Sequence, residues 1–125
     1  MYLVDTNVLL EILLGQDRKE ECKQFLESNI GSLSITDFCL HSIGVILFRY
    51  GKRDVFQRFT EDVIPNVRLL SLPAGLYGEL TRASGSMSLD FDDAYQYTIA
   101  KHNGLKIATL DRDFEGVEGV EVLFL

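Results

Sequence analysis

The chain has 125 residues and a formal net charge of −7, from 12 basic and 19 acidic side chains. This length fits one compact domain over residues 1–125, and 46% hydrophobic residues provide a core, which excludes global disorder. No apolar stretch reaches the roughly 20 residues of a membrane span, and no basic segment precedes the N-terminal apolar run, so we expect a cytoplasmic protein that makes no membrane contact.

The acidic balance limits the kinds of partner. Nucleic-acid phosphates are held by Lys and Arg, so a generally acidic surface does not attract them, whereas it suits a cation site or a basic partner. Cys22 and Cys39 are the only cysteines and lack the CxxC spacing of zinc and redox sites. We therefore predict two buried free thiols.

The first residues combine a buried strand with a polar exit. The apolar run over residues 1–4 predicts a short strand, and Asp5, Thr6 and Asn7 follow it. A densely apolar helix is expected from Val8 to Gly15. Asp17 is then predicted to cap an amphipathic helix that extends to about residue 28.

The middle of the chain alternates between strands and helices. Residues 32–35 predict a weak second strand, and Thr36 or Asp37 is expected to cap the helix that follows, to about residue 50. That helix is apolar almost all round, which predicts that it is largely buried. A further helix is expected over residues 54–62.

The second half repeats this alternation. We expect strands at residues 67–72, 106–110 and 120–125, a helix from Pro73 to about Ala83, a flexible loop at Ser84-Gly85-Ser86 and a helix over residues 90–102. Strands that alternate with helices predict βαβ units. The expected fold is a three-layer α/β sandwich, with a mostly parallel central sheet of four or five strands and helices on both faces.

Several acids are expected at one edge of this sheet. Asp5 leaves the first strand, Asp111 and Asp113 leave the fourth, and Asp93 and Asp37 lie in first turns of helices. In a parallel sheet with crossover helices, the carboxyl ends of strands and the amino ends of helices share one edge. Clustered carboxylates repel unless a cation neutralises them, and Mg²⁺ or Mn²⁺ prefers such hard oxygen ligands. The pattern favours metal-assisted phosphodiester hydrolysis.

Each acid also has an ordinary structural interpretation. A single Asp after a strand is typical of a turn or cap, and Asp90 followed by Asp93 resembles a capping pair. Asp111 to Asp113 is compatible with a simple turn, and Asp37 with an N-cap alone. Their joint placement at one edge is what favours a metal site.

Three blocks of sequence resemble the PIN domain family. Met1-Tyr2-Leu3-Val4-Asp5-Thr6-Asn7 is similar to the opening strand and first acid of that family. Asp93-Ala94, with Ala100-Lys101 and Gly104-Leu105 downstream, is similar to its central acidic helix, and residues 107–114 (IATLDRDF) to its closing strand and acidic turn. The blocks occur in the family's order and span nearly the whole chain.

The resemblance implies an RNA-cleaving enzyme that depends on Mg²⁺ or Mn²⁺. Many small members are VapC-like toxins of toxin–antitoxin pairs, usually homodimers held inactive by an antitoxin protein. Residue by residue, it implies Asp5, Asp93 and Asp111 as metal ligands and Asp113 as an outer or alternative ligand. Thr6, Asn7 and Thr109 are the implied hydrogen-bonding supports.

One departure from the family concerns the helix after the second strand. The family usually has a Glu about one and a half turns into this helix, where the chain has His41 or Ser42. Asp37, one turn or more earlier, is the candidate replacement. Without it the site has three acids, and a non-catalytic PIN-like module that binds a partner protein becomes the alternative function. A receiver-type phosphoryl-transfer domain fits less well, because residues 70–73 (LSLP) contain no acceptor Asp.

Overall fold

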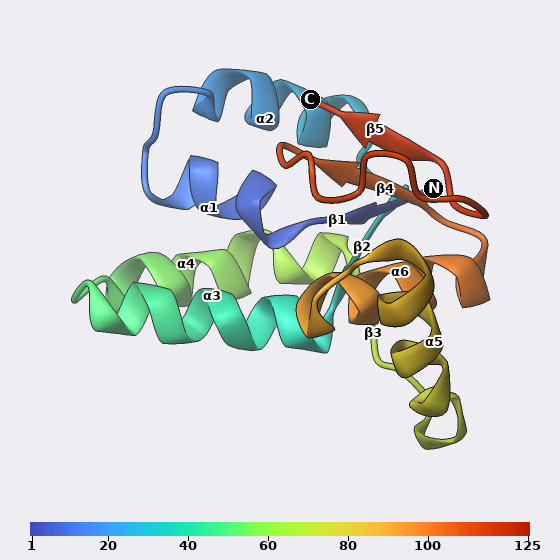
Figure 1. Cartoon of the computed structure of the whole chain (residues 1–125). Coiled ribbons are helices and arrows are strands. Elements are labelled where there is room, and N and C mark those ends of the chain that lie inside the picture. Colours follow the sequence, from blue (N-terminus) through green and yellow to red (C-terminus); the bar gives the residue numbers. More distant parts are fainter.

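Five short strands form one parallel sheet in a computed structural model that describes all 125 residues (Figure 1). The spatial order is β3-β2-β1-β4-β5, and all four pairings are parallel. The strands are β1 (Tyr2–Val4), β2 (Leu33–Thr36), β3 (Arg68–Leu70), β4 (Lys106–Thr109) and β5 (Val122–Phe124). The prediction of a parallel sheet of four or five strands is confirmed.

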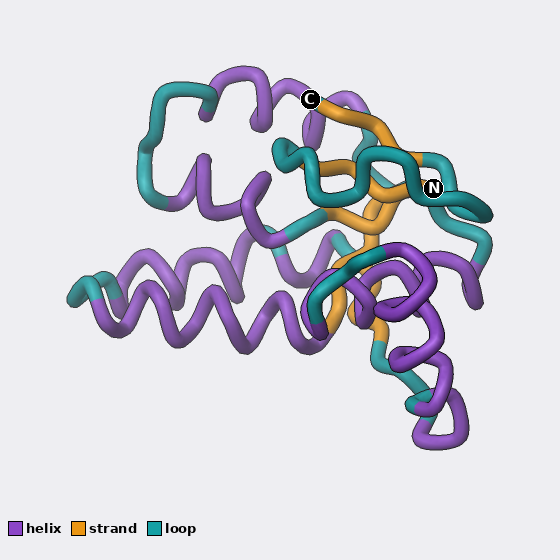
Figure 2. The backbone as a smooth tube through the Cα atoms, in the orientation of Figure 1, coloured by secondary structure: helices purple, strands orange, loops and turns teal.

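Six α-helices cover the two faces of this sheet, and Figure 2 shows the strands gathered between them. They are α1 (Thr6–Leu13), α2 (Lys19–Ser28), α3 (Asp37–Arg49), α4 (Arg53–Asp62), α5 (Gly78–Met87) and α6 (Phe91–Asn103), with short 3₁₀ turns η1 (Ile64–Asn66) and η2 (Ala74–Leu76). Helices α1 to α4 pack on one face and α5 with α6 on the other, each over its own hydrophobic core. The three-layer prediction is therefore confirmed.

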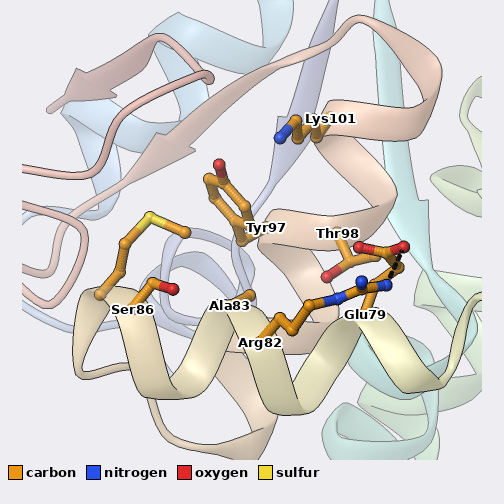
Figure 3. Close-up of a pocket in the computed structure, with 8 residues that line it drawn as sticks. Glu79, Arg82, Ala83, Ser86, Tyr97, Thr98 and Lys101 are labelled. Carbon is orange, nitrogen blue, oxygen red and sulfur yellow. Dashed lines mark hydrogen bonds and ion pairs between the residues drawn. The ribbon is translucent and has the colours of Figure 1, made fainter.

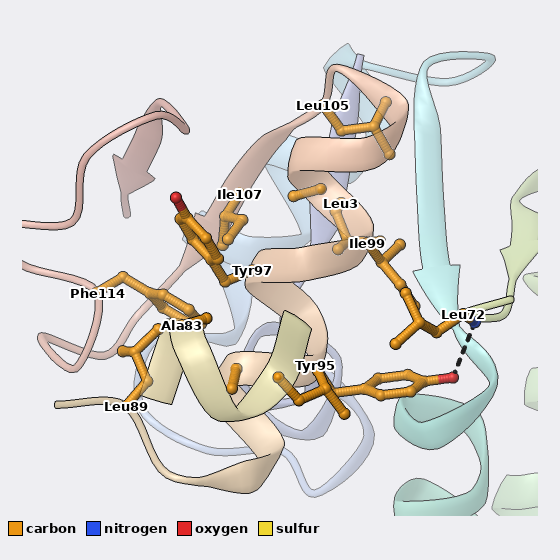
Figure 4. Close-up of a cluster of buried hydrophobic side chains, with 13 residues drawn as sticks. Leu3, Leu72, Ala83, Leu89, Tyr95, Tyr97, Ile99, Leu105, Ile107 and Phe114 are labelled. Atoms are coloured by element: carbon orange, nitrogen blue, oxygen red, sulfur yellow. Dashed lines mark hydrogen bonds between the residues drawn. The ribbon is translucent and has the colours of Figure 1, made fainter. Parts of the chain in front are cut away.

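Strand alternation decides which face receives the acids. Leu3 of β1 and Ile107 of β4 are register partners, and both point into the core under α5 and α6 (Figure 4). Because successive side chains of a strand point to opposite faces, Asp5 and Thr109, each two residues further on, also face α6.

Helix α6 has a clear cap at each end. Asp90 caps its start, where its Oδ1 accepts a hydrogen bond from the Asp93 backbone N–H at 2.9 Å, and Gly104 ends it in the left-handed region at φ 65°. Residues 94–100 are all buried, so the helix is surrounded on every side. Tyr95 reaches past β3, and its Oη accepts from the Leu72 N–H at 3.1 Å (Figure 4).

The region before α6 differs from the sequence prediction. Ser84, Gly85 and Ser86 lie inside α5 rather than in a flexible loop, and the turn after Pro73 is the separate helix η2. Leu80 and Ala83 anchor α5 against α6, so tertiary packing overrides the weak helix propensity of the Ser-Gly-Ser segment.

Two further predictions about the α1–α4 side were wrong. Asp17 does not cap α2, which begins at Lys19; Glu11 of α1 instead accepts a hydrogen bond from the Arg18 N–H at 2.8 Å. Helix α3 is not buried all round, because Val45 and Phe48 are exposed, as 43% and 51% of their surface remains accessible. Thr36 does cap α3, as predicted, by accepting from the Cys39 N–H at 2.9 Å.

Two further observations concern the cysteines and the helices. Cys22 and Cys39 are buried and unpaired, as predicted. None of the helices combines the length and the apolar character needed to cross a membrane.

Candidate functional site

The candidate site lies where the carboxyl ends of β1 and β4 meet the amino end of α6. Asp5 directly follows β1, Asp111 follows β4 by two residues, and Asp93 lies in the first turn of α6. Pairing of β1 with β4 brings the two strand ends together although about a hundred residues separate them in the chain. The three acids therefore lie at one edge of the sheet because β1 pairs with β4 and α6 begins beside their ends.

Asp5 is the buried centre of this site, with 6% of its surface exposed. Although it precedes α1, its side chain makes no cap hydrogen bond. Its Oδ1 accepts from Gln96 Nε2 at 2.7 Å, and its Oδ2 accepts from Thr109 Oγ1 at 2.7 Å and from Asn7 Nδ2 at 3.3 Å. Burial raises the pKa of Asp5, while the Gln96 and Thr109 hydrogen bonds partly counter this rise.

The remaining acids act on one another across the edge. Burial, followed by repulsion from Asp90, Asp113 and Asp5, raises the pKa of Asp93 to about 7. Partial desolvation and the nearby Asp111 raise the pKa of Asp113. Each carboxylate is therefore within electrostatic reach of at least one other, which is the arrangement that favours a bound cation.

The predicted supporting residues tie the two strand ends together. Thr109 Oγ1 accepts from the Asp111 N–H at 3.0 Å while its hydroxyl donates to Asp5. Asn7 Oδ1 accepts from the Leu110 N–H at 3.2 Å. Thr6 lies beside the Cys39 thiol, on the α3 side of the site. Asn7 and Thr109 thus fix the position of Asp5 relative to the acidic turn.

Asp37 lies apart from this group. Its carboxylate is exposed at the start of α3, and its Oδ1 accepts from Tyr95 Oη at 2.7 Å and from the Phe38 N–H at 2.9 Å. His41 is exposed beside a hollow that also includes Val45 and Phe48. Asp37 thus faces Tyr95 of α6 and His41 faces solvent, whereas the Asp5 carboxylate faces Gln96 and Thr109.

Gln96 is the site residue that the sequence analysis missed. It lies three residues after Asp93, which places both side chains on one face of α6. It is buried, with 6% of its surface exposed, and its Oε1 has no hydrogen-bond partner in the protein. A single amide among the mostly apolar residues 94–100 (AYQYTIA) was the available signal in the sequence.

Comparison with known families identifies the architecture. The family model described as PIN domain matches residues 2–120. The chain belongs to the PIN domain family. A comparison with curated protein sequences returns no significant match.

Solved structures share the fold of this PIN domain. A toxin–antitoxin complex from Klebsiella pneumoniae superposes with a TM-score of 0.81 at 22% identity, over 98% of this chain and 96% of that one. FitAcB from Neisseria gonorrhoeae gives 0.72 at 25% identity, over 100% and 97%. Mycobacterium tuberculosis VapC20, described as a toxin that cleaves the sarcin–ricin loop, gives 0.72 at 19% identity, over 96% and 98%.

The donor chemistry of the PIN site fits a hard divalent cation. No three Asp, Glu, His or Cys side chains form a group that could hold an ion in this arrangement. The carboxylates of Asp5, Asp93 and Asp111 and the unpartnered Gln96 Oε1 nonetheless offer only oxygen donors, which Mg²⁺ and Mn²⁺ prefer.

A second cavity lies outside the acidic edge, between α5 and α6 (Figure 3). It measures about 160 Å³, and its cationic side chains are Arg82 and Lys101. Arg82 is paired with Glu79 across one helical turn. Thr98 and Lys101 lie more than one turn beyond Asp93 on α6, and Asp5, Asp93 and Asp111 do not line this cavity.

The high pKa of Asp93 predicts a pH-dependent stability in metal-free buffer. Because this pKa is raised from 3.8 to about 7 in the folded protein, the folded state binds the proton more tightly than the unfolded state, and the free energy of unfolding falls as pH rises between these values. Asp93 is partly exposed, so we expect a loss of only about 1 kcal/mol. Thermal unfolding between about pH 4 and pH 7, with EDTA present, measures it.

Asp90→Ser provides the matched variant for this experiment. Serine retains the N-cap of α6 but removes the second-largest cause of the raised Asp93 pKa. Carboxyl NMR titration should then show a lower pKa for Asp93 and a flatter stability profile. A wild-type Asp93 pKa near 4 would contradict the proximity of these acids.

Proposed function

We propose that this PIN domain is a Mg²⁺- or Mn²⁺-dependent endoribonuclease and the toxin of a toxin–antitoxin pair. The observation that carries the proposal is the convergence of Asp5, Asp93 and Asp111 at one edge of the sheet, where burial and, after it, repulsion by neighbouring carboxylates raise the pKa of Asp93 to about 7. Family membership supports a nuclease, and the similar toxin structures support the biological role.

Each of the chain's own residues has a task in this proposal. Asp5, Asp93 and Asp111 would hold the ion, with Asp113 as an outer or alternative ligand. Thr109 and Asn7 orient Asp5 through hydrogen bonds of 2.7 and 3.3 Å. When bound, the ion would activate a water for attack on the phosphodiester and stabilise the charge that develops on the leaving oxygen.

The basic residues that would meet the RNA phosphates are few. Arg58 pairs with Asp54, and Arg82 pairs with Glu79, so neighbouring acids already neutralise both. Arg53 lies over the Phe48 ring at 5.5 Å. Arg49 lines a hollow together with Asn7, whose side chain contacts Asp5, and is therefore our candidate for a phosphate contact.

The proposal is tested by incubating purified protein with single-stranded RNA. We expect cleavage with Mg²⁺ or Mn²⁺ and none with EDTA, and calorimetry should detect binding of at least one of the two ions. Asp92→Asn is the control for the site variants, because Asp92 is exposed on the same helix turn as Asp93. Dissociation constants above about 1 mM for both ions, together with no cleavage, would contradict the nuclease proposal.

The second candidate function is a non-catalytic PIN-like interaction module. It is favoured by the exposed apolar side chains of α3, Val45 and Phe48, and by Asp37, which faces Tyr95 and would leave the site with three acids. Under this alternative Asp37 does not replace the family's Glu. The same calorimetry separates the two functions, since the interaction module needs no metal.

We further propose two protein partners. The first is a second copy of the chain, docked on the exposed face of α3. The second is an antitoxin, whose apolar segment would occupy a groove of about 370 Å³ lined mostly by hydrophobic residues, among them Leu9, Leu26 and Ile30. Ile30, which lines this groove, has 71% of its surface exposed and would be covered by such a segment. Light scattering of the protein, alone and co-expressed with a neighbouring gene product, tests both partners.

A further inference from the structure

Gln96 has an unusual environment for a polar residue in the middle of a helix. Every residue from Ala94 to Ala100 is buried, and the Gln96 side chain is 6% exposed. Its Nε2 donates to Asp5 Oδ1 at 2.7 Å, which aims the amide at the acidic site. Its Oε1 has no partner in the protein. The Nε2 group of the amide is therefore bound to Asp5, and the Oε1 atom is free to accept a hydrogen bond.

An apolar side chain would be easier to accommodate at this position. Burying an amide oxygen without a hydrogen bond is unfavourable, and the great majority of buried polar atoms have a partner. A methionine has nearly the same length as glutamine and would fill the same space without that penalty. The orphan oxygen therefore points to a ligand outside the chain.

The surroundings of Gln96 indicate the charge of that ligand. The amide contacts Asp5, whose carboxylate lies within electrostatic reach of Asp111 and Asp93. An anion is excluded from such a site by repulsion, whereas a hydrated divalent cation brings both positive charge and water O–H donors. An amide oxygen is itself a suitable hard acceptor.

We propose that Gln96 is a positioning residue of the metal centre. Its Nε2 holds Asp5, and its Oε1 accepts a hydrogen bond from a water of the hydrated cation. The inference rests on the proposed metal-dependent function and adds a residue to it.

Gln96→Met tests the role directly, because it removes both polar atoms while keeping the size of the side chain. Partners of metal ligands typically contribute about 10- to 100-fold to metal affinity, and we expect the Mg²⁺ dissociation constant from calorimetry to rise by that factor. The unfolding temperature in EDTA should stay near the wild-type value, because the orphan oxygen is lost together with the Asp5 contact. A purely structural role predicts the reverse, a lower unfolding temperature with unchanged Mg²⁺ affinity.

NMR of the wild-type protein gives a readout independent of mutation. The Gln96 side-chain amide should shift on addition of Mg²⁺, whereas that of Gln57, an exposed residue of α4 whose Nε2 donates to Glu61 at 3.0 Å, should not. If Mg²⁺ binds and the Gln96 amide does not shift, the proposal is overturned.

Gln96→Glu keeps the test decisive even if the methionine variant does not fold. A carboxylate at this position should bind Mg²⁺ more tightly than wild type and lower the unfolding temperature in EDTA, because it repels Asp5. Unchanged Mg²⁺ affinity in the variants, with a wild type that binds the ion, overturns the role of Gln96 alone. A wild type that binds neither Mg²⁺ nor Mn²⁺ overturns the proposed metal-dependent function itself.

Discussion

Asp5→Asn is expected to reduce metal-dependent RNA cleavage at least about 100-fold. Residues that only support a metal ligand contribute up to about 100-fold, and a direct ligand should contribute at least as much. Asp5 is the most buried of the candidate ligands, and it accepts hydrogen bonds from Gln96, Thr109 and Asn7. An asparagine keeps the shape of this side chain but removes the negative charge that would hold the ion. The initial rate of cleavage of single-stranded RNA, measured at saturating Mg²⁺, gives the effect.

The same substitution should leave the fold intact. Burial already raises the pKa of Asp5, so an uncharged side chain is better tolerated there than at an ordinary ion pair. Thermal unfolding in EDTA should therefore show Asp5→Asn within about 1 kcal/mol of wild type or above it. Asp92→Asn, the exposed control on α6, should retain full cleavage. Equal activity in Asp5→Asn and the wild type would exclude Asp5 as a metal ligand.

Phe114→Ala is expected to lower the free energy of unfolding by about 3–5 kcal/mol, a large part of the roughly 5–15 kcal/mol that stabilises a typical domain. Phe114 is 1% exposed and belongs to the core under α5 and α6 (Figure 4). It directly follows Asp113, so its ring anchors the acidic turn to that core. Urea denaturation monitored by circular dichroism measures the loss.

Phe91→Ala is the matched control for this deletion. Phe91 has 55% of its surface exposed at the start of α6, and its truncation should cost no more than about 1 kcal/mol. At temperatures where Phe114→Ala remains folded, we also expect weaker Mg²⁺ binding, because the turn that carries Asp111 and Asp113 has lost its anchor. Similar losses for the two variants would show that Phe114 does not secure the turn.

Local sequence patterns predicted the framework correctly. Short apolar runs determine strands such as β1 and β4, because a buried strand needs few residues and little long-range information. Asp90 and Gly104 mark the ends of α6 through contacts within a single helical turn. Once the strands and crossover helices were known, the placement of Asp5, Asp93 and Asp111 at one edge followed from the geometry of parallel sheets.

Predictions failed where a residue on another helix decided the outcome. Glu11 accepts the hydrogen bond from the Arg18 N–H at the start of α2, so Asp17 has no capping role. Packing of α5 against α6 makes Ser84, Gly85 and Ser86 helical although their propensities favour a loop. In both cases the deciding partner lies on another element, and the contact depends on how the two elements pack.

The sequence by itself determined the parallel α/β architecture, the PIN resemblance and the edge at which the acids gather, because these depend on periodicity and on the direction of the strands. Only the tertiary structure decided the direction of individual side chains. It turns Asp37 toward Tyr95 and brings Gln96 within 2.7 Å of Asp5, 91 residues away in the chain. Such contacts depend on how α3 and α6 are rotated against the sheet, and packing in the two cores sets those rotations.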